Sequence, residues 1–275
     1  MRSSKYQFPW LYLLLAYGLT WLFWIPLALT RQDYQTSPVL LAGMFLGVFG
    51  PGIAGIVMTY REKGREGGRD FWRRVVDFRR ISLKWVPLIL LLFPALHLIS
   101  IAINHWLGGD PPEFAFIKEA LAIPAGVVVV VILYLLQSAL EELGWRGYML
   151  DRLQAIWKPL PASLVLGIFH TLWHLPLFWM VGTNQSRYLS GVDFSLFVVF
   201  VLSASIYSTW CYNDNQRSTL AVILLHTVAN LSLDTFMLQG TGEYIFKIVL
   251  GLGALMIAVA WSLPSRARKQ IPSAE

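Results

Sequence analysis

Two adjacent glutamates, Glu141 and Glu142, and an arginine one helical turn later, Arg146, follow the apolar run "LAIPAGVVVVVILYLLQSAL". An ionisable group at the centre of a membrane helix costs at least about 2.5–3.5 kcal/mol on insertion scales. Glu142 and Arg146 are four positions apart with the acid first, which is the favourable order for an ion pair on one helix. Glu141 points about 100° away from Glu142. The ion pair therefore does not account for Glu141, which is a candidate for chemistry.

Two later apolar segments carry the other polar groups. The segment "FHTLWHLPLF" has His170 and His174 on one helix face, and "LLHTVANLSL" has His226 and Asn230 four positions apart. In a partly dry cavity these groups could hydrolyse an amide, with Glu141 as the general base that activates water. His174 would orient this water or return its proton to the leaving amine. His226 and Asn230 would donate hydrogen bonds to the developing oxyanion.

The same side chains also suit a metal ion. Glu141, His174 and His226 could hold Zn²⁺ with water in the open position, so zinc is a candidate cofactor. The spacing differs from the helical His-Glu-x-x-His motif of zinc proteases, which weighs against a metal. Nothing in the sequence separates metal-activated water from carboxylate-activated water.

The composition is that of a membrane protein. Of the 275 residues, 56% are hydrophobic and 14% are charged, whereas soluble domains carry about 25% charged residues. A helix that spans the bilayer needs about 20 residues. We therefore expect one all-α integral-membrane domain over 1–275, with eight helices at roughly 10–30, 38–60, 85–104, 120–140, 160–181, 194–212, 219–238 and 244–263. The fourth helix is expected to continue to about Leu150.

The basic residues predict how the chain is oriented. If the N-terminus is cytoplasmic, 17 of the 22 Lys and Arg residues fall in segments on the cytoplasmic side, as the positive-inside rule expects. This predicts a multi-pass protein of the cell membrane with both termini in the cytoplasm and a basic cytoplasmic loop at 61–84. That loop is interpreted either as a short amphipathic segment on anionic lipid headgroups or as a solvated determinant of topology. The charge distribution argues against nucleic-acid binding.

The expected depths allow the polar groups to meet. Glu141, His174, His226 and Asn230 lie roughly 10–21 Å from the cytoplasmic ends of their helices at 1.5 Å per residue. All four thus fall in one layer of the cytoplasmic half. His97, alone in its segment, is expected to pack within the bundle, and His105 is expected at an outer loop end.

These motifs resemble those of a known family. The order Glu141-Glu142-x-x-x-Arg146, His174 before Leu-Pro, and His226-x-x-x-Asn230 is similar to that of the CPBP intramembrane endopeptidases, which include the CAAX prenyl proteases. The similarity covers about 120–240. It implies that Glu141 activates water with His174 as its partner, that His226 and Asn230 form an oxyanion hole, and that Glu142 and Arg146 support them. The family generally has an aromatic residue where this chain has His170, so the role of His170 stays open.

The expected function is therefore an intramembrane endopeptidase that cuts a membrane-associated substrate, prenylated or unmodified, near the cytoplasmic face. Two alternatives remain from the residues alone. Buried Glu and His also build proton or solute pathways, although the chain has no internal inverted repeat of the kind found in many transporters. The polar cluster could also serve a non-catalytic scaffold by holding helices together.

Overall fold

The computed structural model describes residues 7–112, 114, 118, 122–187 and 191–263. Of the described residues, 84% are helical and none lies in a strand. Within this described part of the chain, eight helices are long and apolar enough to cross a membrane, which confirms the expected all-α bundle. The termini predicted to be cytoplasmic, 1–6 and 264–275, lie outside the described residues.

The helices begin and end close to the predicted boundaries, except at the ends of the second and the fifth. The fifth α-helix ends at Trp173 instead of about 181, so His174 lies just beyond it and a short 3-10 helix follows. The fourth continues without interruption as a π-helical segment, η3 (Trp145–Met149), and a short helix, α6, as predicted from its apolar pattern. The main elements are α1 (Trp10–Thr30), α2 (Pro38–Val76), α3 (Trp85–Trp106), α5 (Pro124–Gly144), α6 (Leu150–Gln154), α7 (Pro159–Trp173), η4 (Leu175–Trp179), α8 (Gly191–Asp214), α9 (Thr219–Phe236) and α10 (Thr241–Ser262).

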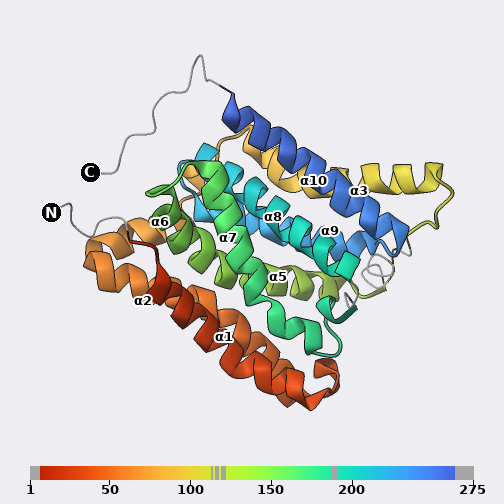
Figure 1. Cartoon of the computed structure of the whole chain (residues 1–275), viewed down its shortest axis with the longest axis horizontal. Helices are drawn as coiled ribbons and strands as arrows, with labels where there is room; N and C mark the ends of the chain where they lie inside the picture. Colours follow the sequence, from red (N-terminus) through yellow and green to blue (C-terminus); the bar gives the residue numbers. More distant parts are fainter. Residues whose placement is uncertain (1–6, 113, 115–117, 119–121, 188–190, 264–275) are drawn as a thin grey trace.

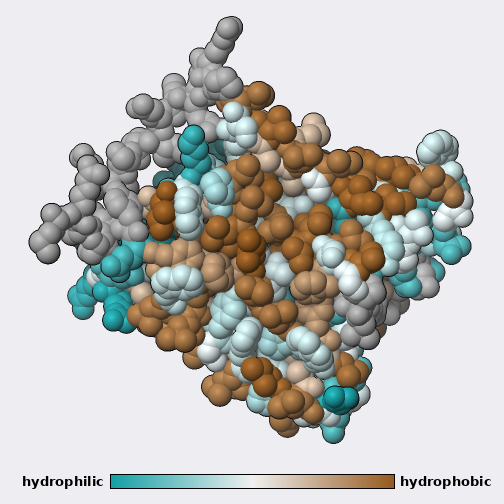
Figure 2. Space-filling model, viewed as in Figure 1, coloured by the Kyte–Doolittle hydropathy of each residue, from teal (hydrophilic) through white to brown (hydrophobic). Residues whose placement is uncertain are grey.

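The helices that carry the motifs lie in the middle of the bundle. In Figure 1, α1 and α2 form one side, α3 and α10 form the other, and α5, α7, α8 and α9 lie between them. On the face shown in Figure 2, apolar residues cover most of the middle of the bundle, and the more hydrophilic residues gather towards its edges. Such a surface suits a lipid environment, in which polar groups are kept inside the bundle or at its ends.

Small residues bring α5 close to α2. A Cβ atom at Gly144 would lie 2.2 Å from the Pro51 carbonyl oxygen, and one at Gly52 would lie 2.5 Å from the Leu140 carbonyl oxygen. Close approach through glycine is a common way of packing helices within membranes, where apolar burial gives little driving force. This contact presses the end of α5 that bears Glu141 and Glu142 against a neighbouring backbone.

The segment 61–84 differs from the predicted loop. Helix α2 continues to Val76, interrupted only at Gly64, whose φ of 58° and ψ of −153° form a conformation that favours glycine. Phe71 and Arg74 are buried, so this part of the helix packs on the bundle. Val76 and Phe78 are exposed and remain available to a lipid surface.

The Arg74 side chain points into the bundle because its hydrogen-bond partners lie there. Its guanidinium donates to Asp151 at 3.0 Å, to the Tyr212 hydroxyl at 2.6 Å and to the Gly147 carbonyl at 3.0 Å. Arg217, in the connection before α9, also pairs with Asp151. Opposite charges at sequence positions far apart thus hold the basic segment against η3 and α6.

We expect the Arg74→Met substitution to lower the free energy of unfolding by about 3–5 kcal/mol, because it leaves part of a buried ionic network without its partner. The measurement is denaturant unfolding in detergent micelles. The matched control is Arg73→Met, at an exposed neighbouring position, which should change stability by less than about 0.5 kcal/mol. Equal stability of the two variants would show that the Arg74 contacts do not stabilise the fold.

Candidate active site

A buried ion pair stands at the end of α5. Arg146 Nη1 donates to both carboxylate oxygens of Glu142, at 2.8 and 3.0 Å. Both side chains are almost fully buried. The predicted pair is therefore present, and it holds the first residues of η3 against the last turn of α5.

His226 of α9 joins the same carboxylate. Its Nδ1 lies 2.9 Å from Glu142 Oε1, so Glu142 has one partner on its own helix and another across the bundle. The sequence assigned His226 to an oxyanion hole or to a metal and did not predict this contact. The Glu142 bond fixes the orientation of the ring and leaves Nε2 as its second nitrogen.

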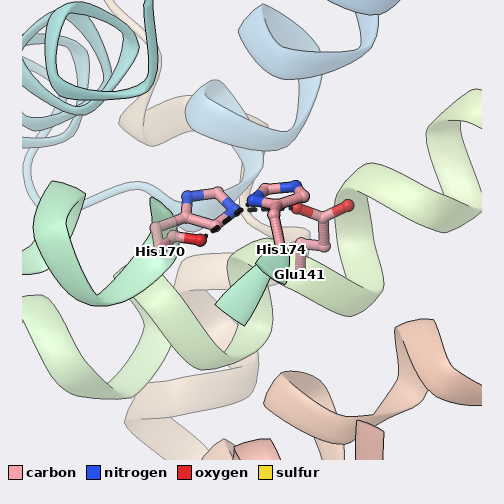
Figure 3. Close-up of side chains that lie close together, drawn as sticks. All are labelled: Glu141, His170 and His174. Carbon is pink, nitrogen blue, oxygen red and sulfur yellow. Dashed lines mark hydrogen bonds and ion pairs between the residues drawn. The ribbon is translucent and has the colours of Figure 1, made fainter. Parts of the chain in front are cut away.

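Glu141 has separate partners. Its Oε2 lies 3.2 Å from His170 Nε2, and its Oε1 accepts a bond of 3.4 Å from Gln137. His174 Nδ1 donates to the His170 carbonyl at 2.9 Å, and the two imidazole rings stack with centroids 4.9 Å apart. Figure 3 shows both imidazoles beside the Glu141 carboxylate. His170, whose role the sequence left open, is thus a polar member of the site.

Aromatic side chains pack around this cluster. Trp145 lies against His170 with ring centroids 4.9 Å apart, and Trp173 lies 4.8 Å from His174. Trp173 is itself held by a bond of 2.8 Å from its indole nitrogen to Thr20. Gln137, Trp145 and Trp173 were not predicted as members of the site from the sequence. For Gln137 the sequence did offer a signal, because it is a polar residue in an apolar run one helical turn before Glu141.

One cavity of about 380 Å³ connects these groups. Its lining includes every predicted site residue, namely Glu141, Glu142, Arg146, His170, His174, His226 and Asn230. His97 also lines it, but its Nδ1 bonds the Phe93 carbonyl at 2.9 Å and its ring stacks on Phe246, in keeping with the predicted packing role. His105 is exposed at the end of α3.

The cavity reaches the end of the bundle that lies away from the basic segment. Asn184 and Gln239, both exposed, line it at the connections before α8 and α10. Helix α9 begins at the opposite end of the bundle, beside the basic segment 61–84. There Arg80 donates to the Gln216 carbonyl at 2.7 Å. The site was expected in the half nearer the basic segment. The structure adds that the cavity is exposed at the other end.

The donor set is compatible with a zinc ion. One ligand atom from each of Glu141, His170 and His174 lies within 4.8 Å of the others. The 3.2 Å between Glu141 and His170 is close to the separation of about 3.3 Å between two ligands of tetrahedral zinc with bonds near 2.0 Å. His170 therefore takes the place of His226 in the candidate ligand set, because Glu142 engages His226.

Two comparisons with known proteins bear on the chain. A family model described as "Type II CAAX prenyl endopeptidase Rce1-like" matches residues 122–232, which contain all the site residues named above. The CAAX prenyl protease 2 of Methanococcus maripaludis is 31% identical over 257 residues, which cover 93% of this chain and 94% of that protein.

We expect metal-free protein to take up one equivalent of Zn²⁺, because two imidazoles and a carboxylate form a common set of zinc ligands. The measurement is equilibrium dialysis followed by elemental analysis of the protein. The variants His170→Ala and His174→Ala should lose this zinc, whereas His226→Ala should keep it. Zinc uptake that His170→Ala leaves unchanged would contradict the ligand set.

Proposed function

Because the chain belongs to the Rce1-like family of CAAX prenyl endopeptidases, we propose that Glu141 activates water to cleave a peptide bond in a membrane-associated substrate. The family supports an intramembrane endopeptidase of the hydrolase class and so favours hydrolysis over the transporter and scaffold alternatives. The observation that carries the mechanism is that the two adjacent glutamates have different partners. Arg146 and His226 engage Glu142, while Glu141 faces two histidines in the cavity.

The proposed reaction begins with Glu141. Its carboxylate takes a proton from water as the water oxygen attacks the scissile carbonyl carbon. When the C–N bond breaks, the leaving nitrogen receives a proton from Glu141 or through His174, and the products are a carboxylate and an amine. His174 donates its Nδ1 proton to a backbone carbonyl, so a neutral ring has its lone pair on Nε2. That nitrogen can accept a hydrogen bond from the attacking water.

His226 and Asn230 are proposed to stabilise the oxyanion. They lie one turn apart on α9 and line the same cavity. The His226 Nδ1–H donates to the Glu142 carboxylate, so Nε2 donates to the oxyanion when the ring is in its protonated, imidazolium form, in which both nitrogens carry a proton. Donors fixed in advance of the reaction stabilise developing charge without reorganisation, and the loss of one such donor typically lowers kcat by about 10²–10³-fold.

Zinc would have a defined place in this scheme. Glu141, His170 and His174 would hold it, and a bound zinc ion lowers the pKa of its water and polarises carbonyl groups. In either form of the mechanism His226 and Asn230 keep the same role, because they lie outside the candidate ligand set.

The substrate is proposed to be a membrane-associated protein or peptide. The prenylated class carries a lipid on the cysteine of a C-terminal C-a-a-X sequence, and cleavage after that cysteine would release three residues. This substrate is presented in the cytoplasm. If it enters by the exposed end of the cavity, that end must face the cytoplasm, and the basic segment would then face the opposite side, against the charge rule. If the substrate is an unmodified membrane peptide, the exposed end of the cavity does not have to face the cytoplasm.

We expect Glu141→Gln to lower kcat for a farnesylated C-a-a-X peptide by at least about 10²-fold, because an amide cannot act as the general base. Asn230→Ala should lower it by about 10²–10³-fold through the oxyanion. The measurement is release of the C-terminal tripeptide by purified protein, followed by mass spectrometry.

The matched control is Glu66→Gln, an exposed acid in the basic segment, which should cleave at the rate of the unmodified protein. Thermal unfolding in the same detergent shows that each variant is folded. If the Glu141→Gln variant cleaves as fast as the control, Glu141 is not the base.

Cysteine labelling in intact cells separates the two substrate classes. The chain has one cysteine, Cys211, which is buried and can be replaced by alanine. Entry of a prenylated substrate by the exposed end of the cavity predicts that Gln239→Cys, at that end, is protected from a membrane-impermeant maleimide, while Glu66→Cys is labelled. Labelling of Gln239→Cys from outside would contradict entry of a prenylated substrate by this end and would support an unmodified peptide.

A further inference from the structure

The cavity contains a lysine that the proposed mechanism does not use. Lys247 belongs to the membrane-spanning helix α10, is 3% exposed and lines the same cavity as Glu141. Its Nζ lies 2.8 Å from Glu243 Oε1, one turn earlier on the same helix. Ionisable groups inside a membrane are costly, face cavities and mark sites of function. Apolar residues would serve α10 better if packing were its only role here.

Aromatic contacts fix the level of Lys247 in the bundle. The adjacent residue, Phe246, stacks on His97 with centroids 3.8 Å apart, and His97 also stacks on Phe236 at the end of α9, at 5.2 Å. Lys247 therefore lies near the level at which α9 ends, towards the exposed end of the cavity.

A second contact relates this level to Glu141. Near the end of α9, Asp234 accepts a hydrogen bond from the hydroxyl of Tyr134 on α5. Tyr134 precedes Glu141 by seven residues, which is about 10 Å along the helix axis. Lys247 and Glu141 thus occupy one cavity at levels separated by roughly 10–15 Å.

The component of this separation along the bundle axis is that of a short peptide. An extended chain spans at most about 3.3–3.6 Å per residue, so three or four residues reach from the level of Glu141 to that of Lys247. A substrate cut after the cysteine of a C-terminal C-a-a-X sequence has three residues beyond the scissile bond. Its terminal carboxylate would then lie at the level of the ammonium group.

We propose that Lys247 binds the C-terminal carboxylate of the substrate and so selects for cleavage close to a free C-terminus. This inference rests on the proposed function and deepens it. Glu243, whose side chain is 25% exposed, keeps the ammonium charge balanced before substrate arrives. An ammonium group has three donors, so one ammonium group can bind more than one carboxylate. Such a charge-assisted bond in a partly dry cavity is stronger than a neutral one.

Two farnesylated C-a-a-X peptides test the proposal, one with a free C-terminal acid and one with a C-terminal amide. We expect the unmodified protein to prefer the acid by about 10–100-fold in kcat/KM, the usual range for a hydrogen bond to a charged group. In Lys247→Met the acid-to-amide ratio should fall to about 1, whereas Lys247→Arg should retain a preference for the acid. The control Lys158→Met, at an exposed position before α7, should keep the full ratio.

The double variant Lys247→Met/Glu243→Gln removes both charges and avoids a buried acid without its lysine, so it tests the same ratio where the single variant folds poorly. A ratio near 1 in the unmodified protein, or a ratio that the double variant retains, would overturn the assignment of Lys247. Failure of the proposed function looks different, because Glu141→Gln would then leave cleavage of both peptides unchanged.

Discussion

The structure depends on the need to pair every charge that the bundle takes out of water. Glu142 meets this need with Arg146 on its own helix and His226 on α9. Removal of one partner from a buried pair is far more costly than the pair itself is stabilising, so these contacts specify how α5 and α9 sit against each other. They also leave the neighbouring carboxylate, Glu141, to other partners. Two adjacent residues of the same type thus acquire different environments because a helix turns them to different faces.

The same requirement acts at both ends of the bundle. At the basic end, Arg74 and Arg217 converge on Asp151, and Arg74 also reaches the Gly147 carbonyl inside the π-helical segment η3. Single-turn π-helices often occur at functional sites, and this one carries Arg146. Towards the other end, Tyr134 and Asp234 join α5 to α9. The helices that carry the proposed catalytic groups are therefore tied together on both sides of the site, which preserves the geometry that catalysis requires.

The polar groups between these contacts all line one cavity. Glu141, the two stacked histidines, His226 and Asn230 come from α5, α9 and the end of α7, and each lines the same space. In that space the dielectric constant is lower than in water, so fixed donors and charges act strongly on a reacting peptide bond. In the proposed scheme Lys247, which lies towards the exposed end, adds the choice of substrate to the proposed cleavage. The Rce1-like family and the arrangement of the site point to the same class of reaction.

The sequence by itself determined what depends on local spacing. The helix boundaries follow from the lengths of apolar runs, and the Glu142–Arg146 pair follows from two residues four positions apart. The sequence could not show that His226 turns to Glu142, that His170 rather than His226 joins Glu141 and His174, or that α2 continues past Gly64 and buries Arg74. It also gave no reason to connect Lys247 with the site. Those contacts join different helices, and they depend on the rotation and relative height of each helix, which close packing and charge pairing decide only in the folded bundle.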